Sequence, residues 1–199
     1  MAPQIKLSYF YLAGRGELTR LTFAAAGIDF EDERISYEAF NTLKASLPLG
    51  KVPTLTVDGV TYLQSMAIAR YAGRLGGFYP TDPLAALKID EIMESLSEAF
   101  ETIVDIAMYT PDADEKAKKI VTLKARLEVV FAFVESKIQS KFLFGEEMTL
   151  ADIHLFDFFA HAVLVVCPEY TLESFPKIAA TIETVKAMPK IAAYLAARP

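Results

Sequence analysis

The sequence contains little of the two residue types that most often build disulfides and metal sites. There is one cysteine, Cys167, so an intramolecular disulfide is excluded. The two histidines, His154 and His161, are too few for a zinc site unless several carboxylates join them. We therefore expect a protein without a bound metal, in which Cys167 is an inert packing residue.

The sequence also lacks an excess of basic residues and a long apolar run. Lys and Arg number 20 against 26 Asp and Glu, which gives a formal net charge of −6 and a pI near 5.0. A nucleic-acid-binding protein needs a basic face to release counterions, so we expect no nucleic-acid partner. The most apolar stretch, Leu155 to Cys167, is interrupted by Asp157 and His161 and falls short of the roughly 20 residues of a membrane span.

The first residues, Met1 to Gln4, show neither the basic stretch nor the apolar core of a signal peptide. We therefore expect a soluble cytoplasmic protein that has no membrane partner. Of the 199 residues, 53% are hydrophobic and 23% are charged, with both signs interspersed, which indicates a folded chain. This length is enough for two small domains that each bury a core.

Residues 1–79 alternate between strand and helix patterns, in the order β-α-β-α-β-β-α. Asp58-Gly59, between two apolar runs, is the dipeptide best suited to a two-residue hairpin, and Gly27 is suited to ending the first helix. A strand-helix-strand unit is parallel and a tight hairpin is antiparallel, so we expect a mixed four-stranded sheet. The expected strands are 5–10, 28–35, 54–57 and 60–63, and the expected helices are 17–26, 37–47 and 65–75, the last capped by Ser65.

After Pro80 the pattern becomes wholly helical. Asp82-Pro83 combines a capping residue with a first-turn proline, and Thr149 and Asp152 have the spacing of a capping box. We therefore expect an α/β domain at 1–79, a linker at 80–82 and an all-helical domain at 83–199. The expected helices are 84–109, 114–139, 150–166, 175–187 and 190–197.

Tyr9, near the end of the first strand, is the first candidate for chemistry. Strand alternation sends Ser8 and Phe10 to the opposite face, so only one hydroxyl can face a pocket here. A tyrosine beside a helix N-terminus can donate its O–H to an anion, or it can be an ordinary half-buried side chain. Arg15, between two glycines, is either a solvated loop charge or a functional cation.

Two further positions offer groups that could hold an extended ligand. Pro53 opens an apolar strand, which is compatible with a cis bond that leaves the backbone of Val52 unpaired, or with a simple edge-strand proline. Gln64 and Ser65 stand at a helix start, where unpaired amides suit a carboxylate. Ordinary capping by Ser65 is the alternative.

Four segments, taken in order, resemble the cytosolic glutathione transferases. The resemblance is greatest to the sigma-like class, which includes the glutathione-dependent prostaglandin D synthases and the lens S-crystallins, and it spans nearly the whole chain. It implies a thioredoxin-like first domain and an all-helical second domain, in agreement with the pattern above. The segments are YFYLAGRGE at 9–17, FNTLKASLPLGKVPTLTVDG at 40–59, QSMAIARYAGR at 64–74 and TLADIHLFD at 149–157.

The resemblance also implies glutathione as co-substrate and a role for each matching residue. Tyr9 would donate its O–H to the glutathione sulfur and stabilise the thiolate, with the Arg15 cation beside it. The glutathione-binding residues would be Val52 and cis-Pro53 for the cysteinyl part, Gln64 and Ser65 for the γ-glutamyl carboxylate, Phe40, Lys44 and Lys51 for the glycyl end, and Glu98 of the other subunit for the γ-glutamyl amine.

The family further implies an apolar pocket for the electrophile. Such a wall accepts many electrophiles and specifies none strongly. Core packing is the alternative for the residues that lie in helices. The pocket residues would be Tyr11, Leu12 and Ala13 of the first loop, and Met93, Phe100, Met108 and Tyr109 of the helical domain.

Two positions depart from the family pattern. Phe40 stands where the family often has tryptophan, and the chain contains no tryptophan, so an indole N–H toward the glycyl carboxylate is lost. Ser97-Glu98 replaces a pair of aspartates, which weakens the assignment of an acidic group contributed across subunits.

The expected activity is that of a glutathione S-transferase. The thiolate would attack a hydrophobic electrophile, such as an aryl halide, an enal or an epoxide, and form a thioether in a detoxifying conjugation. We expect a homodimer, because the family completes its site across subunits. The alternatives are a glutathione-dependent isomerase of the prostaglandin D synthase type and a non-catalytic, S-crystallin-like or ligand-binding protein.

Overall fold

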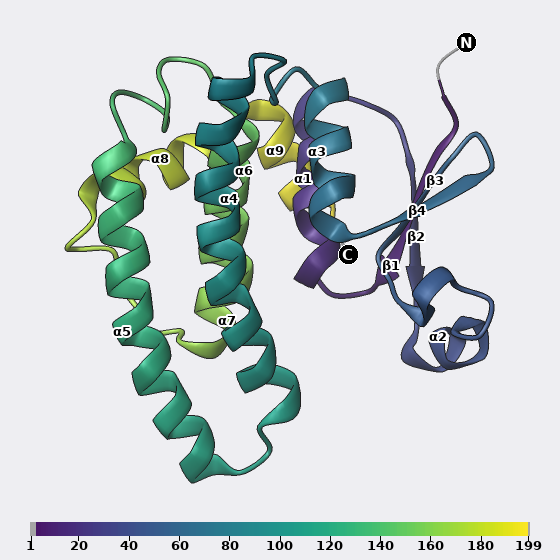
Figure 1. The fold of residues 1–199 in the computed structure, drawn as a ribbon, viewed down its shortest axis with the longest axis horizontal. Coiled ribbons are helices and arrows are strands. Elements are labelled where there is room, and N and C mark those ends of the chain that lie inside the picture. Colours follow the sequence, from purple (N-terminus) through teal and green to yellow (C-terminus); the bar gives the residue numbers. More distant parts are fainter. Residues whose placement is uncertain (1–2, 199) are drawn as a thin grey trace. The chain divides into compact units, whose positions relative to one another are not determined.

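The computed structural model describes residues 3–198, which divide into two compact units (Figure 1). The second unit is the continuous segment Pro80–Met188, whereas the first unit combines the chain up to Tyr79 with the segment that begins at Pro189. The C-terminal helix, which the sequence pattern assigned to the helical domain, therefore belongs to the first unit.

The first unit is built on a four-stranded sheet in the order β2-β1-β3-β4. The strands are β1 (Ile5–Phe10), β2 (Glu31–Ile35), β3 (Thr54–Val57) and β4 (Val60–Leu63). β1 is parallel to β2 and antiparallel to β3, and β3 and β4 form the expected hairpin. The predicted mixed sheet is confirmed, and the order of strands and helices makes this unit thioredoxin-like.

Four helices belong to the first unit: α1 (Gly14–Ala26), α2 (Tyr37–Leu43), α3 (Ser65–Leu75) and α9 (Pro189–Ala197). Figure 1 shows α1 and α3 side by side along one face of the sheet, and side chains of both join its core. Gly27, in the left-handed conformation with φ 72°, ends α1 as predicted. The buried core consists of Ile5, Leu7, Phe23, Leu55, Ile68 and Ala72.

Some boundaries differ from the expected ones. β2 begins at Glu31, three residues after the predicted start at Ile28. α2 ends at Leu43 and not at Leu47, because both the amide and the hydroxyl of Ser46 donate to the carbonyl of Leu43. Leu47 is already extended, as the residue before a proline usually is.

An aromatic cluster joins the end of β1 to α2. Phe10 stacks on Tyr37 with ring centroids 4.5 Å apart and meets the edge of Phe40 at 5.2 Å. Ser8 donates to the Glu33 carboxylate on the neighbouring strand. Ser8 therefore faces Glu33, whereas the Phe10 ring has a packing role and also lies 5.3 Å from the Tyr9 ring, so the expected separation of Phe10 from Tyr9 stays a prediction.

The second unit contains α4 (Pro83–Val104), α5 (Ala113–Lys137), α6 (Leu150–Phe158), α7 (Leu164–Val166) and α8 (Pro176–Lys186). Asp82 caps α4 by accepting from the amide of Ala85 at 2.8 Å, as its sequence context predicts. The predicted capping box at Thr149 and Asp152 is present at the start of α6. Within residues 3–198, no helix combines the length and the apolar character needed to cross a bilayer.

Two of the predicted helices are not regular α-helices throughout. The predicted helix 84–109 changes at Asp105–Tyr109, and the predicted helix 150–166 changes at Phe159–Val163, each into a π-helical turn. A π-turn inserts a residue into the i to i−4 ladder and thereby rotates the side chains that follow it.

Candidate functional site

The strand register brings several of the predicted site residues to one end of the sheet. Ser8 is paired with Thr54, and Thr54 is paired with Leu63, so these three residues form a row across β1, β3 and β4. Tyr9, the Val52–Pro53 bond and Gln64 lie immediately beyond this row. Residues that are up to 55 positions apart in the numbering therefore meet at one edge, where α3 also begins.

The hydroxyl of Tyr9 is held by the start of α1. Its Oη accepts a hydrogen bond of 3.1 Å from the backbone N–H of Arg15. α1 begins at Gly14, so Arg15 lies in the first helical turn and not in a loop, which corrects the expectation from sequence. The first amides of a helix have no partner within the helix, and here one of them is used on the phenol. The O–H of Tyr9 keeps its capacity to donate to another acceptor.

Burial raises the pKa of Tyr9 above its ordinary value, and the amide and the charge of Arg15 oppose part of this rise. The side chain is only 6% exposed. A raised pKa keeps the phenol protonated near neutral pH, so Tyr9 is a hydrogen-bond donor and not a phenolate.

Gly14 and Gly16, which were not among the expected site residues, allow this arrangement. A Cβ at Gly16 would lie 2.6 Å from Cδ1 and 2.9 Å from Cγ of Tyr9, and a Cβ at Gly14 would lie 2.7 Å from its Oη. The ring therefore packs directly against the backbone of the first turn of α1. The signal in the sequence was the pair of glycines around Arg15.

The start of α3 has an unusual backbone. Gln64 has φ 74° and ψ 103°, in a region that non-glycine residues rarely adopt. The helix begins at Ser65, and Gln64 is the N-cap residue, whose side chain makes no capping hydrogen bond. The prediction that the Ser65 hydroxyl caps the helix is therefore wrong. Strained backbone of this kind is typical of ligand-binding positions.

The Val52–Pro53 bond is cis, as expected. Pro53 is buried and Val52 is half-buried, and β3 begins only at Thr54, so Val52 lies outside the ladder with β1.

The residues expected at the glycyl end of the ligand gather around α2. The Lys44 ammonium lies 5.9 Å from the centroid of the Phe40 ring. A Cβ at Gly50 would lie 3.4 Å from Lys44 Cγ, so the chain after α2 folds back toward this lysine. Lys51 is exposed and directly precedes Val52.

Comparison with known proteins decides the family. The family model described as "Glutathione S-transferase, N-terminal domain" matches residues 5–74, and "Glutathione S-transferase, C-terminal domain" matches residues 97–198. This chain belongs to the glutathione S-transferase family. The matched segments include the residues that meet at the end of the sheet.

Relatives with different names share the whole length of the chain. The hematopoietic prostaglandin D synthase of Gallus gallus is 36% identical over 200 residues, covering 99% of this chain and 98% of that protein. Glutathione S-transferase 3 of Caenorhabditis elegans is 34% identical over 202 residues, with 98% and 96% covered. S-crystallin SL11 of Nototodarus sloanii is 31% identical over 209 residues, with 98% and 97% covered.

A solved structure gives the same result for the fold. Rat hPGDS complexed with a quinoline superposes with a TM-score of 0.90 at 28% identity, covering 99% of this chain and 98% of that one. Membership of the sigma-like class, expected from sequence motifs, agrees with this set of relatives.

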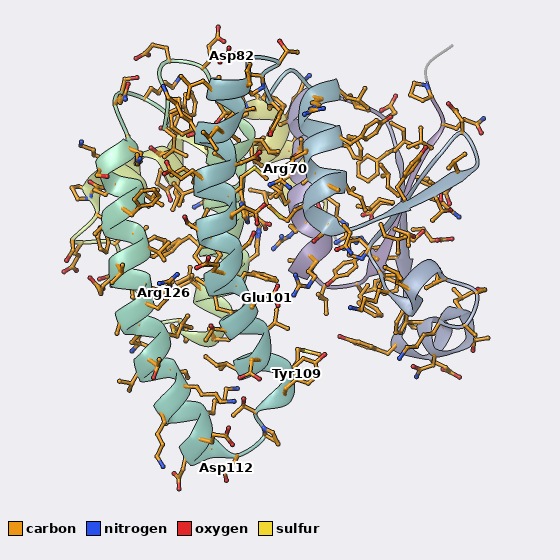
Figure 2. All side chains as sticks on the ribbon, viewed as in Figure 1. Arg70, Asp82, Glu101, Tyr109, Asp112 and Arg126 are labelled. Carbon is orange, nitrogen blue, oxygen red and sulfur yellow. The ribbon has the colours of Figure 1, made fainter. Side chains whose placement is uncertain are left out.

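Of the remaining predicted site residues of this family member, five belong to the second unit and three to the first. Figure 2 shows Tyr109 beyond the end of α4 and Arg126 on α5. Met108 and Tyr109 are 56% and 74% exposed, whereas Met93 is fully buried, which favours core packing for Met93. Glu98 is exposed and forms an ion pair with Arg126. In the first unit, the side chains of Tyr11 and Leu12 are exposed and Ala13 is half-buried.

Among the described residues there is no group of three or more His, Cys, Asp or Glu side chains arranged to hold a metal ion. His161 Nδ1 lies 2.9 Å from Asp157 Oδ1 in the second unit.

Proposed function

We propose that this protein conjugates glutathione to hydrophobic electrophiles, with Tyr9 as the residue that activates the thiol. The observation that carries the proposal is the position of the Tyr9 hydroxyl, which accepts from the Arg15 amide and keeps its own proton at neutral pH. A protonated phenol at this place is a donor for a sulfur anion. After the thiol proton has passed to water, the thiolate sulfur forms a bond to the electrophilic carbon. An aryl halide then loses its halide with the bonding pair, whereas an enal or an opened epoxide takes up a proton from water.

The expected gain follows from the strength of one hydrogen bond to an anion. Such a bond contributes about 1.5–3 kcal/mol, and one pKa unit corresponds to about 1.4 kcal/mol. Tyr9 would therefore lower the thiol pKa of bound glutathione by about one to two units from its free value of about 8.5. This shift makes the thiolate a major species near neutral pH.

The proposed glutathione site follows the edge of the first unit. The backbone of Val52, next to cis-Pro53, would pair with the cysteinyl part, and Gln64, Ser65 and the first amides of α3 would hold the γ-glutamyl carboxylate. Lys44 and Lys51 would bind the glycyl carboxylate. Because Phe40 has no N–H to offer, the Lys44 ammonium beside its ring is the donor that remains at this position.

The family resemblance supplies apolar candidates for the electrophile pocket, and each unit is considered by itself. Tyr11, Leu12 and Ala13 are the candidates in the first unit, and Phe100, Met108 and Tyr109 are the exposed or half-buried candidates in the second. Met93 was also proposed for this wall, although its burial favours a packing role.

We further propose a homodimer in the cytoplasm, in which Glu98 of one subunit serves the γ-glutamyl amine in the other. The ion pair between Glu98 and Arg126 would have to open or rearrange for this role. Sedimentation at micromolar concentration should give a species of twice the 22.0 kDa chain mass. A species of a single chain mass would refute both the dimer and the shared site.

Two other functions remain on the same fold. A glutathione-dependent isomerase is favoured by the likeness to prostaglandin D synthases, and a non-catalytic protein by the likeness to S-crystallins. Both would bind glutathione at the same edge. The isomerase would return glutathione unchanged, and the non-catalytic protein would bind glutathione without turnover.

The test is steady-state conjugation of glutathione to a chromogenic aryl halide by the wild type and Tyr9→Phe. Loss of one hydrogen bond to an anion should lower the rate about 10- to 150-fold. Tyr170→Phe is a matched control, because Tyr170 is also buried and hydrogen-bonded but lies in the second unit. An unchanged rate in Tyr9→Phe would remove Tyr9 from the mechanism.

A further inference from the structure

The loop between Tyr9 and α1 is held by its backbone and not by its side chains. The Tyr11 side chain is 66% exposed and that of Leu12 is 38% exposed, so neither anchors the loop by burial. The carbonyls on either side of Tyr11 are nevertheless both occupied. Arg20 Nη2 donates to the carbonyl of Phe10 at 3.1 Å, and Arg20 Nη1 donates to the carbonyl of Leu12 at 2.9 Å.

Arg20 is completely buried, and a buried charge is tolerated only where it is paired and hydrogen-bonded. Its Nε donates to Asp32 Oδ1 at 2.9 Å, and its Nη1 lies 3.3 Å from Glu17 Oε2. The planar guanidinium therefore has partners on all of its edges, which fixes its orientation as well as its charge. Its Cζ also lies 5.7 Å from the centroid of the Tyr9 ring.

Glu17 connects this arginine to the C-terminal helix. Its carboxylate is 2% exposed, and its second oxygen, Oε1, accepts from Tyr194 Oη at 3.0 Å and from Arg198 Nη1 at 2.9 Å. Tyr194 lies in α9 and Arg198 directly follows it. One oxygen of Glu17 thus faces Arg20, and the other faces residues 177 and 181 positions further along the chain.

We propose that α9 is a positioning element of the active site. Tyr194 and Arg198 fix Glu17, and Glu17 and Asp32 fix Arg20. Arg20 in turn fixes the end of β1 next to Tyr9 and the loop that follows it, which includes the pocket wall at Tyr11 to Ala13. This inference rests on the proposed transferase function. Glu17, Arg20 and Tyr194 touch no reacting atom and act through the loop. Loosening any of them should misplace the Tyr9 hydroxyl relative to the glutathione sulfur while leaving the residues that bind glutathione in place.

The first test is Tyr194→Phe, which removes only the hydroxyl that donates to Glu17. The pH–rate profile for aryl halide conjugation should move upward by about 0.5–1 unit, because the bound thiol is less well stabilised, and the rate at pH 6.5 should fall about 3- to 10-fold. The rates of variant and wild type should converge at alkaline pH, where the thiol ionises without help. The KM for glutathione should change less than about twofold, since the variant leaves uniform binding intact.

Tyr170→Phe is the matched control, since it loses a comparable bond of 2.8 Å from a buried tyrosine to Glu128 in the second unit. A purely structural role for Tyr194 would lower the thermal midpoint in both variants and shift the pH profile in neither. The proposal is overturned if the profile of Tyr194→Phe coincides with that of Tyr170→Phe.

A second measurement does not depend on turnover. Amide hydrogen exchange in residues 11–15 should be faster in Tyr194→Phe and Glu17→Gln than in wild type and Tyr170→Phe, because opening of the loop is no longer opposed by the fixed guanidinium. If the wild type fails to conjugate glutathione, the proposed function is lost but this comparison still decides the role of α9. Equal exchange in all four proteins would exclude the coupling.

Discussion

Gly16→Ala tests whether the close packing of Tyr9 against α1 is required for catalysis. The added Cβ would lie 2.6 Å from Cδ1, 2.9 Å from Cγ and 3.1 Å from Cβ of Tyr9. Ordinary contacts between carbon atoms are about 3.5–4.0 Å, so ring and helix must separate by about 1 Å. Neither side can yield easily, because the ring is buried and Gly16 lies within the first turn of α1.

The magnitude follows from this displacement. Overpacking of a buried site costs about 1–3 kcal/mol of stability. A misplacement of about 1 Å in a catalytic group can lower the rate about 100-fold, so we expect kcat to fall by about 30- to 100-fold. The fall should be close to that in Tyr9→Phe, and the double variant Tyr9→Phe with Gly16→Ala should be little worse than either, because both changes remove the same bond.

The assay is conjugation of a chromogenic aryl halide at saturating glutathione, with the thermal midpoint measured on the same samples. Gly59→Ala is the control: no atom lies within 4 Å of the new Cβ, but the residue has φ 83°, so the variant loses about 1–2 kcal/mol through backbone strain alone. Its kcat should match that of wild type. If Gly16→Ala keeps its kcat within about threefold, the contact between Gly16 and the Tyr9 ring does not position the hydroxyl.

Gln64→Gly should relieve the backbone strain at φ 74° and raise the free energy of unfolding by up to about 1 kcal/mol, while it raises the KM for glutathione. Urea unfolding would measure the stability and steady-state kinetics the KM. A lower free energy of unfolding in the variant would argue against strain at this position. Burial and the Glu128 carboxylate raise the pKa of Tyr170, so the protonated phenol stabilises the folded state below the unfolded pKa of about 10, and this contribution is lost as the pH rises further. Between pH 8 and pH 11, the free energy of unfolding measured in urea should therefore fall less in Tyr170→Phe than in wild type. An equal fall in both proteins would contradict a stabilising role for the protonated Tyr170 phenol.

The elements that the sequence predicted correctly are those governed by local interactions. Ile5 to Phe10 alternates and is bounded by turn residues, and β1 has those bounds. Asp58-Gly59 needs positive φ at both positions, which the structure shows at 49° and 83°. The capping residues Asp82 and Thr149 also act within one turn of their own helix. Short-range chemistry of this kind can be read from a single sequence.

The features that the sequence did not reveal depend on contacts between distant segments. We expected Arg15 to act through its charge. In the structure its backbone N–H donates to the Tyr9 hydroxyl, and this bond requires α1 to begin at Gly14. Ser65 has a high capping propensity, but the turn from β4 into α3 places Gln64 at the N-cap. Arg20 was not among the residues singled out from the sequence, because its role depends on Asp32 and on the carbonyls of Phe10 and Leu12.

The discontinuous first unit has a consequence for how this chain folds during synthesis. Lys190 donates to the carbonyl of Ala26 across 164 positions, so α9 can join α1 only after the ribosome has made the whole second unit. Each doubling of a closed loop costs only about 0.6 kcal/mol, so the separation delays assembly far more than it weakens the final structure. Until then α1 presents Glu17 without its partners Tyr194 and Arg198, and Tyr9, the proposed catalytic residue, would be among the last residues to reach its final geometry.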